Sequence, residues 1–527
     1  MLFKKKKPEE KEETIFKVEI QHEIPVLPDF PNKEDTDVRY PLIEPYAYAH
    51  IHWDPKFQEV VYEIEEPKLN KKEQEILKTL EEGIKELINI SFISIKEKNK
   101  VVAYLEKNAK ILLRELGISI SKETFLKLMY YIYRDFVGLN EFEPLLCDYF
   151  IEDIECNGVD TPVYIVHRKY RNLRTSIVFT SIPYLASLVE KIAQKCGKYV
   201  SYASPILEGS LPDGSRVSAT YTTEITSKGP SITIRKFYKE PWSPVKLIEL
   251  GTVSPEILAY LWMAVEHEFN IMVIGGTGTG KTTFLNGIAF FIPPQARIVS
   301  IEDTRELMLM HENWLPSVAR EGIGLANIVG QKYGEVTMFD LLKESFRQRP
   351  DYVVVGEIRG KEAYVLFQGM ASGHPSMGTM HANDVDTMIK RLQTPPINLS
   401  PSLVETMDIV CVMARAKTKG KEVRRLKQVT EVISVSEEGS AETNMPFKWD
   451  PKTDTFYYNL DNSHVIQQLI ERHGFTKETL MQEFEFRTRL LYELYRRKIF
   501  DYREVQKIIN EYMRAPRRVL KQFGIIK

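Results

Sequence analysis

The spacing of hydrophobic residues changes along the chain, and its first long regular stretch predicts helices. Residues 71–88 read KKEQEILKTLEEGIKELI, in which apolar residues recur three or four positions apart, as on one face of an amphipathic helix. The same spacing recurs over 101–117 and 122–138. We therefore expect an N-terminal helical bundle over 61–147.

Shorter segments with a different pattern follow the helical region. Residues 162–170 and 231–237 are rich in β-branched and aromatic residues and predict strands, whereas 182–197 has helical spacing and ends at a glycine. LPDGSRVSATY, residues 211–221, contains Asp-Gly, which is typical of a hairpin turn that opens a strand. These elements predict a small α/β domain over 148–238.

Strand-like and helical patterns alternate over 251–460, which is typical of a mostly parallel sheet covered on both faces by helices. The fold class of this domain is therefore α/β. Within it, 434–450 is polar and predicts a loop. Helical spacing returns over 461–527 as a C-terminal extension, and two closely spaced prolines mark 239–250 as an interdomain linker.

The first 60 residues lack this periodicity. Prolines recur from Pro25 to Pro45, so we expect residues 1–60 to form an extended, flexible tail. The basic run Lys4–Lys7 near its start has two interpretations. It is either a solvated segment, or it contacts a membrane face or a partner and gives peripheral membrane association.

Composition and charge argue against several classes of protein. Lys and Arg number 71 and Asp and Glu 73, so a formal charge of -2 gives no general attraction to nucleic acid. The 4 cysteines contain no C-x-x-C pair, which argues against a zinc site or a disulfide framework. Neither a membrane-length apolar run nor a secretory signal is present. We expect a cytoplasmic protein, peripheral at the inner face of the cell membrane.

The most specific signal is IMVIGGTGTGKTTFLNGI, residues 271–288, which matches the P-loop pattern G-x-x-x-x-G-K-[ST]. A β-favouring run, 271–274, precedes the glycine-rich turn, and a helical pattern begins at Lys281. The nucleotide-binding residues predicted by this match are Gly275, Gly276, Thr277, Gly278, Thr279, Gly280, Lys281, Thr282 and Thr283.

Each part of this motif suits a nucleotide phosphate. Glycines allow successive backbone amides to point at phosphate oxygens, and the helix N-terminus adds further donors. Lys281 would reach the β- and γ-phosphates, and the Thr282 hydroxyl would ligate Mg²⁺. The predicted cofactors are therefore ATP and Mg²⁺. The alternative is a strand-to-helix turn that binds no ligand.

A carboxylate that would complete the Mg²⁺ site is predicted at the end of a second strand. In RPDYVVVGEIRG, residues 352–355 predict a buried strand, and Glu357 follows at the end where ligands bind in such sheets. Gly356 occupies the usual aspartate position, so we expect Glu357 to hold Mg²⁺ through water. The alternative is a surface salt bridge.

Two further predicted strands end in polar residues. Glu302 and Asp303 follow the strand 298–301, and we favour Glu302 to orient or deprotonate the attacking water, with Asp303 as a candidate metal or loop ligand. His381 follows the strand 377–380 and would contact the γ-phosphate. A structural role for this histidine stays open.

The order of these motifs identifies a resemblance. The P-loop followed by SIEDT, RQRPDYVVVGEIRG and GTMHAND resembles the secretion ATPases of type II secretion and type IV pilus systems, where these are the Walker A motif, aspartate box, atypical Walker B motif and histidine box. IEDTRELMLMHENW, LPDGSRVSATY, SITIRKF and RLQTPPINLSPSLVETMDIV resemble the archaeal branch. That branch includes the archaellum motor ATPase and archaeal pilus-assembly ATPases. The match covers about residues 140–440.

The resemblance implies a RecA-like ATPase domain in a homohexamer of two-lobed subunits. It implies that Arg216 and Arg235, from the N-terminal lobe, complete the site. Arg347, Arg349 and Arg359 are candidates to serve a neighbouring subunit. Some bacterial members carry a four-cysteine zinc module that this chain lacks, so no structural metal is expected.

The function expected from these features is Mg²⁺-dependent ATP hydrolysis. It would move the N-terminal lobe against the ATPase lobe and drive filament assembly or rotation through an integral membrane platform protein. The alternatives are a nucleic-acid-translocating or conjugation-type ATPase, which the near-zero charge does not favour, and a nucleotide-gated scaffold. Glu302, Glu357 and His381 argue against a pure nucleotide binder.

Overall fold

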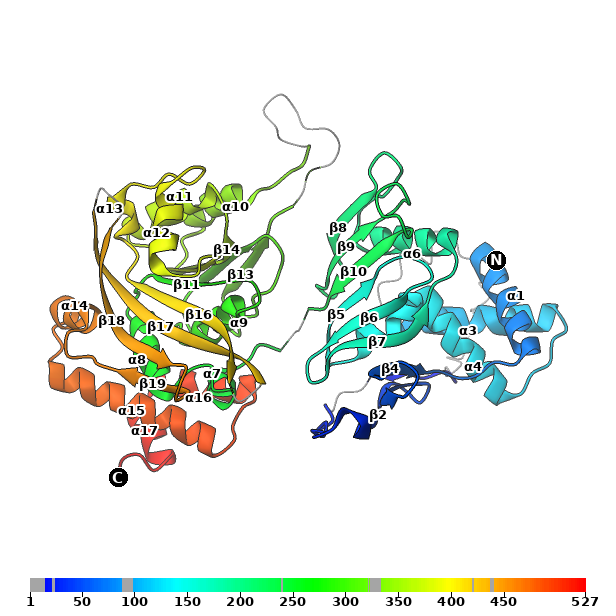
Figure 1. Cartoon of the computed structure of the whole chain (residues 1–527), viewed down its shortest axis with the longest axis horizontal. Helices are drawn as coiled ribbons and strands as arrows, with labels where there is room; N and C mark the ends of the chain where they lie inside the picture. The colour runs from blue at the N-terminus through cyan, green and yellow to red at the C-terminus, as the bar shows by residue number, and fades with distance from the viewer. Residues whose placement is uncertain are drawn as a thin grey trace, which may run out of the picture. The chain divides into compact units, whose positions relative to one another are not determined.

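The chain folds into two compact units, Met1–Phe237 and Tyr238–Lys527 (Figure 1). Each unit has its own hydrophobic core. The predicted basic run Lys4–Lys7 lies outside the described residues. The computed structural model describes residues 15–20, 24–87, 98–237, 240–320, 322, 333–418, 421–436 and 440–527.

Over its described residues, the first unit contains a ten-stranded sheet in the order β1-β2-β3-β4-β7-β6-β5-β10-β9-β8. Its pairs are antiparallel except for β4 with β7. The strands are β1 (Glu19–Ile20), β2 (Asp37–Glu44), β3 (Ala47–Asp54), β4 (Glu59–Glu65), β5 (Ile151–Cys156), β6 (Pro162–His167), β7 (Arg171–Val178), β8 (Ile206–Ser210), β9 (Arg216–Thr220) and β10 (Ser231–Arg235).

The prediction of an extended tail over residues 1–60 is wrong where β2 and β3 lie. On β3, Ala47, Ala49 and Ile51 are buried while the intervening Tyr48 and His50 are not. This alternation buries one face of the strand against the core. The prolines do not prevent the sheet, because a strand, unlike a helix, tolerates proline at edges and turns.

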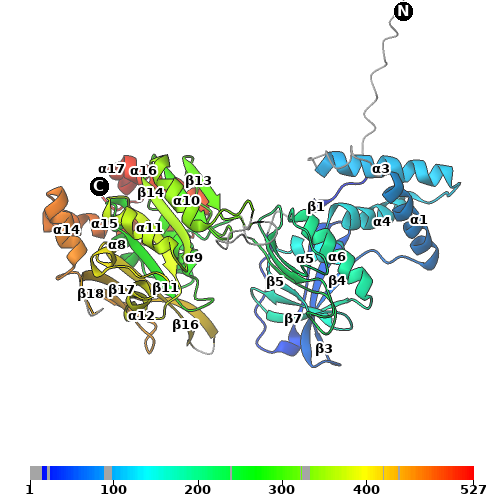
Figure 2. The same cartoon turned by 90° about the horizontal axis from the view of Figure 1, so that it is seen from above.

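The helices of the first unit share one core with its sheet. The three predicted amphipathic helices are present as α1, α3 and α4, which lie together (Figure 2). Leu80 of α1 and Leu128 of α4 belong to the same buried cluster as Ile51 of β3, so the helices do not form a separate bundle. The helical segments are η1 (Lys33–Asp35), α1 (Lys71–Leu87), α3 (Lys98–Glu115), α4 (Lys122–Ile132), η2 (Tyr133–Val137), η3 (Asn140–Phe142), α5 (Glu143–Cys147) and α6 (Ile182–Lys195).

The described part of the second unit contains a nine-stranded sheet in the order β13-β12-β14-β15-β11-β16-β17-β18-β19. The pairs from β13 to β16 are parallel and those from β16 to β19 are antiparallel. The strands are β11 (Ile271–Gly275), β12 (Ile298–Glu302), β13 (Trp314–Val318), β14 (Tyr352–Ile358), β15 (Ser376–Met380), β16 (Ile409–Thr418), β17 (Lys421–Val435), β18 (Ala441–Asp450) and β19 (Thr455–Tyr458).

Helices cover both faces of this sheet, as the sequence predicted. Along β11, Ile271 and Val273 pack into one core with α8 and α9, whereas Met272 and Ile274 pack into another with α10, α11 and α12. The predicted α/β fold class is confirmed. The helical segments are α7 (Pro244–Glu249), α8 (Pro255–Glu266), α9 (Lys281–Ala289), α10 (Met338–Ser345), η4 (Phe346–Gln348), α11 (Glu362–Ala371), α12 (Val385–Gln393), α13 (Pro401–Val404), α14 (His464–His473), α15 (Lys477–Arg496), α16 (Tyr502–Arg514) and α17 (Pro516–Gln522).

Two local predictions in the second unit are wrong. The expected linker 239–250 contains α7, whose Val245 and Leu247 are buried in the core, because Pro244 at its first turn favours helix initiation. The expected loop 434–450 contains β18, where Phe447 and Trp449 are buried at alternate positions. Helices are present in the predicted C-terminal extension as α14, α15, α16 and α17. Among the described helices, none combines the length and apolarity needed to cross a bilayer.

Candidate functional site

The glycine-rich turn connects the fully buried strand β11 to helix α9. Because β11 lies between β15 and β16, the turn emerges near the middle of the sheet, at the carboxyl ends of its parallel strands. The first helical residue is Lys281, and Gly280 precedes it with φ 90°. This φ lies in the left-handed region, where glycine avoids the strain that a side chain causes. Thr282 and Thr283 follow in the first turn of α9.

Close packing requires a glycine at the start of the turn. A Cβ atom at Gly275 would lie 2.6 Å from the carbonyl oxygen of Met413 and 2.6 Å from Thr279 Oγ1. The Thr279 hydroxyl donates to the Gly276 carbonyl over 2.9 Å. At Gly278, which has φ 71°, a Cβ atom would meet nothing within 4 Å. The turn is therefore anchored at Gly275 and open at Gly278.

The Lys281 side chain folds back along the turn, and its ammonium donates to the Gly276 carbonyl over 3.0 Å. The residue is only 9% exposed. Burial lowers the pKa of Lys281, and the nearby carboxylates of Glu357 and Glu306 oppose this effect. The Lys281 ammonium is thus held within the turn, where the carboxylates of Glu357 and Glu306 interact with it electrostatically.

Glu302 ends β12 and is 1% exposed. Its Oε1 accepts hydrogen bonds from the backbone N–H groups of Glu306, at 2.7 Å, and Leu307, at 2.8 Å. Its buried Oε2 has no hydrogen-bond partner among the described residues. Burial raises the pKa of Glu302 from its ordinary 4.5 to about 7. A carboxylate with such a pKa can accept a proton near neutral pH.

Gly356 makes room for this carboxylate. A Cβ atom there would lie 2.9 Å from Glu302 Cγ and 3.4 Å from Oε1. The Gly356 carbonyl accepts a 2.6 Å hydrogen bond from the buried Thr379 hydroxyl of β15. Glycine rather than the usual aspartate therefore occupies position 356 because a side chain there would collide with Glu302.

Arg359 connects two of the predicted metal-site carboxylates. Its Nε donates to Glu357 Oε2 over 2.9 Å, and its Nη1 donates to Asp303 Oδ2 over 3.3 Å. The backbone N–H of Arg359 is fixed by Glu362 Oε1 at 2.6 Å. Arg359 is a candidate to serve a neighbouring subunit, and that role stays a prediction.

His381 lies directly beyond β15 and beside the glycine-rich turn. Its Nε2 is 2.8 Å from Thr277 Oγ1, and its carbonyl accepts a hydrogen bond from Arg391. Asn383, which sequence reasoning missed, places its Oδ1 3.5 Å from the position of a Cβ at Gly276. Its only sequence signal was its place in the GTMHAND motif. Thr277 and His381 form a direct contact between the turn and the segment that follows β15.

Arg216 and Arg235 belong to the first unit, where they are directly paired across β9 and β10. The Arg235 Nε donates to Asp153 Oδ1 over 3.1 Å, with the Arg235 side chain 67% exposed. In the second unit, Arg347 pairs with Glu344 at 3.5 Å. The roles predicted for these arginines stay predictions.

The donor set of the second unit fits a magnesium nucleotide. The turn offers backbone amides, the buried Lys281 supplies a cation, and the Thr282 hydroxyl stands at the N-terminal end of α9. Glu302 contributes a buried carboxylate with an unpartnered oxygen. This combination provides phosphate binding, a hard-metal ligand and a proton acceptor at the carboxyl ends of parallel strands in one sheet.

Comparisons with known proteins agree with this arrangement. Residues 142–474 match the family model described as Type II/IV secretion system protein, so the chain belongs to that family. The predicted resemblance to the secretion ATPase superfamily is confirmed.

Three relatives illustrate the range of similarity. The chain is 38% identical over 396 residues to Uncharacterized protein MJ0900 of Methanocaldococcus jannaschii, covering 74% of this chain and 70% of that one. It is 40% identical over 274 residues to Uncharacterized protein MJ1287 of the same organism, covering 50% and 99%. It is 30% identical over 276 residues to Type IV secretion system protein PtlH of Bordetella pertussis, covering 46% and 79%.

Proposed function

We propose that the second unit binds and hydrolyses Mg²⁺-ATP and that the chain is the motor of a secretion- or pilus-type system. The observation that carries the proposal is the pairing of a phosphate-binding turn, with Lys281 buried inside it, and the buried carboxylate of Glu302. A turn that only connected a strand to a helix would need neither group.

The proposed reaction is in-line attack of water on the γ-phosphate of ATP. Backbone amides of residues 275–281 hold the phosphates, and the Lys281 ammonium neutralises charge that develops on the transferred group. Glu302 Oε2 accepts the proton of the attacking water. Mg²⁺, when bound, neutralises phosphate charge, with Thr282 as its ligand and Glu357 and Asp303 as outer carboxylates.

Arg359 suggests how the outer carboxylates are controlled. It bridges Glu357 and Asp303 in this structure, so one guanidinium offsets part of the negative charge of the two carboxylates. Glu357 and Asp303 would hold Mg²⁺ through water, and Arg359 would compete with the ion for the same carboxylate oxygens. His381, which contacts Thr277 of the turn, would contact the γ-phosphate and so connect the presence of this group to β15.

The membership of the type II/IV secretion family supports a wider role. We propose a homohexamer that acts on an integral membrane platform protein and assembles or rotates a pilus-like or archaellum-like filament. Hydrolysis would move the first unit relative to the second, and this motion would act on the platform protein. Arg216 and Arg235 would complete the site from the first unit, since an arginine can pair with the γ-phosphate when nucleotide is bound.

Phosphate release from Mg²⁺-ATP by the full-length chain tests this proposal. Lys281→Ala is expected to lower the rate at least 100-fold, since the buried cation is lost. The matched control is Lys477→Ala, which removes a half-exposed lysine that starts α15. The control should retain the parent rate. Equal rates for Lys281→Ala and the parent would contradict the assignment of the site.

A further inference from the structure

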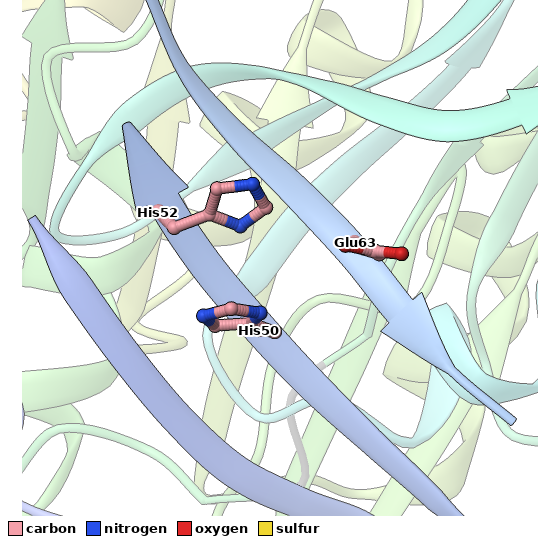
Figure 3. Close-up of side chains that lie close together, drawn as sticks. All are labelled: His50, His52 and Glu63. Carbon is pink, nitrogen blue, oxygen red and sulfur yellow. The ribbon is translucent and has the colours of Figure 1, made fainter. Parts of the chain in front are cut away.

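The described residues contain a group of metal-ligand side chains in the first unit, on the sheet formed by β2, β3 and β4. His50, His52 and Glu63 each offer one ligand atom, and these atoms lie within 4.8 Å of one another. Figure 3 shows the two imidazoles near each other on β3 with the Glu63 carboxylate beside them on the neighbouring strand. None of the three belongs to the nucleotide site.

Strand geometry explains why these residues meet. His50 and His52 are two positions apart on β3, so both imidazoles point to the same face of the sheet. Glu63 is the direct partner of His50 in the antiparallel pairing of β3 with β4. Residues that are paired in this way have Cβ atoms about 5 Å apart. The three side chains are therefore brought together by the backbone and not by a flexible loop.

Surrounding groups orient the first histidine. His50 Nε2 lies 2.8 Å from Asp37 Oδ1, and His50 Nδ1 lies 3.5 Å from Glu65 Oε1. A carboxylate that holds one ring nitrogen of a histidine is the usual support for a metal bond at the other nitrogen. Here Asp37 would hold Nε2, and the longer contact of Glu65 with Nδ1 would be replaced by the metal bond. Asp37 lies on β2, opposite His52, so all three strands contribute.

The second histidine has a ring nitrogen without a partner. His52 Nδ1 is buried and makes no hydrogen bond within the described part of the chain. The rings of His50 and His52 are 4.4 Å apart between centroids. A shielded nitrogen beside a second imidazole and a carboxylate is costly without a ligand, and a metal bond would satisfy it.

Charge on this face also favours a cation. Asp37, Glu63 and Glu65 are acidic, and Arg39 is the basic residue paired opposite His50. The Arg39 Nε is bound to Glu65 Oε2 at 2.6 Å, and its guanidinium lies 4.2 Å from the centre of the Tyr48 ring. Arg39 is thus held by other groups, and Glu63 stays available to balance part of the charge of a dication.

We propose that His50, His52 and Glu63 bind a divalent transition-metal ion of the Zn²⁺ class that fastens β3 to β4. Two imidazoles and one carboxylate match the ligand set of zinc, whereas Mg²⁺ and Ca²⁺ prefer oxygen ligands alone. Tetrahedral zinc ligands lie about 3.3 Å apart, so small side-chain rotations bring the three atoms to bonding positions. Water would supply the fourth ligand.

Zinc binding to the chelator-treated full-length protein, in competition with a chromophoric zinc indicator, tests the proposal. The number of Zn²⁺ ions bound per chain is expected to be larger by one for the parent than for the double variant His50→Gln/His52→Gln. Glu63→Gln is expected to weaken binding at least 10-fold. The matched control is Glu59→Gln. Glu59 lies on the same strand and face as Glu63, roughly 13 Å from it along the strand, and this variant should bind zinc as the parent does.

Two readouts keep the test independent of folding and of the proposed function. Co²⁺ added to the parent should give the visible absorption of an imidazole-bound ion, and the double variant, if folded by circular dichroism, should not. Lys281→Ala, which disables the nucleotide site, should bind zinc as the parent does. Equal zinc binding by the parent and the folded double variant, or no binding by the parent, would overturn the proposal.

Discussion

At the scale of single residues, the proposed role of Glu302 as general base rests on its burial. Its Oε1 accepts hydrogen bonds from two backbone amides. Its Oε2 is also buried but has no hydrogen-bond partner among the described residues. Burial disfavours the charged form, so the pKa of Glu302 is raised to about 7. A carboxylate that is half ionised near neutrality is suited to general base catalysis.

Replacing Glu302 by glutamine should separate binding from hydrolysis. Glu302→Gln keeps the shape of the side chain and removes the basic oxygen, so kcat should fall by about 10²–10⁴-fold. Nucleotide affinity, measured with a fluorescent ATP analogue, should change less than about threefold. The parent's kcat should rise with pH through about 7, because the ionised form is the active one.

The same substitution should change how stability depends on pH. The folded protein binds the Glu302 proton more tightly than the unfolded chain, so this group's stabilising contribution is present below pH 4.5 and is lost as the pH rises through about 7. Glu302→Gln does not titrate. Its melting temperature relative to the parent should therefore be higher at pH 8 than at pH 5, and a difference that is independent of pH would argue against the raised pKa.

Gly356 offers a second test at the residue scale. Gly356→Ala would place a methyl group 2.9 Å from Glu302 Cγ, so the carboxylate must move. Since small displacements of a catalytic group are costly, we expect kcat to fall at least 10-fold with nucleotide affinity retained. Affinity and kcat falling together would show instead that the whole site had been disturbed.

At the scale of elements, the ends of the parallel strands assemble the site. Strands β12, β14, β15 and β11 are neighbours, and each carries a site residue at or just beyond its carboxyl end. The strands were predicted at 271–274, 298–301, 352–355 and 377–380, from short runs that end in glycine or polar residues. They are observed at 271–275, 298–302, 352–358 and 376–380. The side-chain contacts were not predictable. That Arg359 joins Glu357 to Asp303 depends on tertiary packing, which sequence spacing does not contain.

Elements outside the site were harder to predict, for physical reasons. The region around β2 and β3 was taken for a tail because its prolines exclude a helix, although they are compatible with strands. The segment around α7 was taken for a linker because two prolines lie close together there. The alternate burial of apolar residues specifies strand β2, whereas Pro244 lies in the first turn of α7, where proline is compatible with a helix.

Helix α7 should support the nucleotide site by packing. Leu247 is 1% exposed, and its Cδ1 lies 2.5 Å from the position of a Cβ at Gly287 of α9. Leu247→Ala should lower the free energy of unfolding by about 2–5 kcal/mol, because it leaves a cavity behind α9. Urea denaturation checks this, with Leu250→Ala as the control.

The control residue differs in burial and not in type. Leu250 follows α7 and is 40% exposed, so its truncation should change stability by no more than about 0.5 kcal/mol. Equal losses for the two variants would indicate that α7 behaves as a linker, as the sequence suggested.

At the scale of the whole molecule, the two units contribute different groups to the proposed cycle. The second unit holds the turn, Lys281 and Glu302, and the first unit holds the adjacent arginines Arg216 and Arg235. If these arginines neutralise transition-state charge, Arg216→Ala should lower kcat at least 10-fold and leave nucleotide affinity nearly unchanged. Arg171→Ala, an exposed residue that starts β7, is the control, and equal rates for both variants would argue against the role.

The central claim is that one turn binds a nucleoside triphosphate and that Glu302 promotes cleavage of its terminal bond. The most direct test identifies the nucleotide recovered from protein incubated with Mg²⁺-ATP and freed of unbound ligand. The account predicts ADP from the parent, intact ATP from Glu302→Gln and almost no nucleotide from Lys281→Ala. Recovery of ADP from Glu302→Gln at the parent's rate, or of nucleotide from Lys281→Ala at the parent's level, would contradict it.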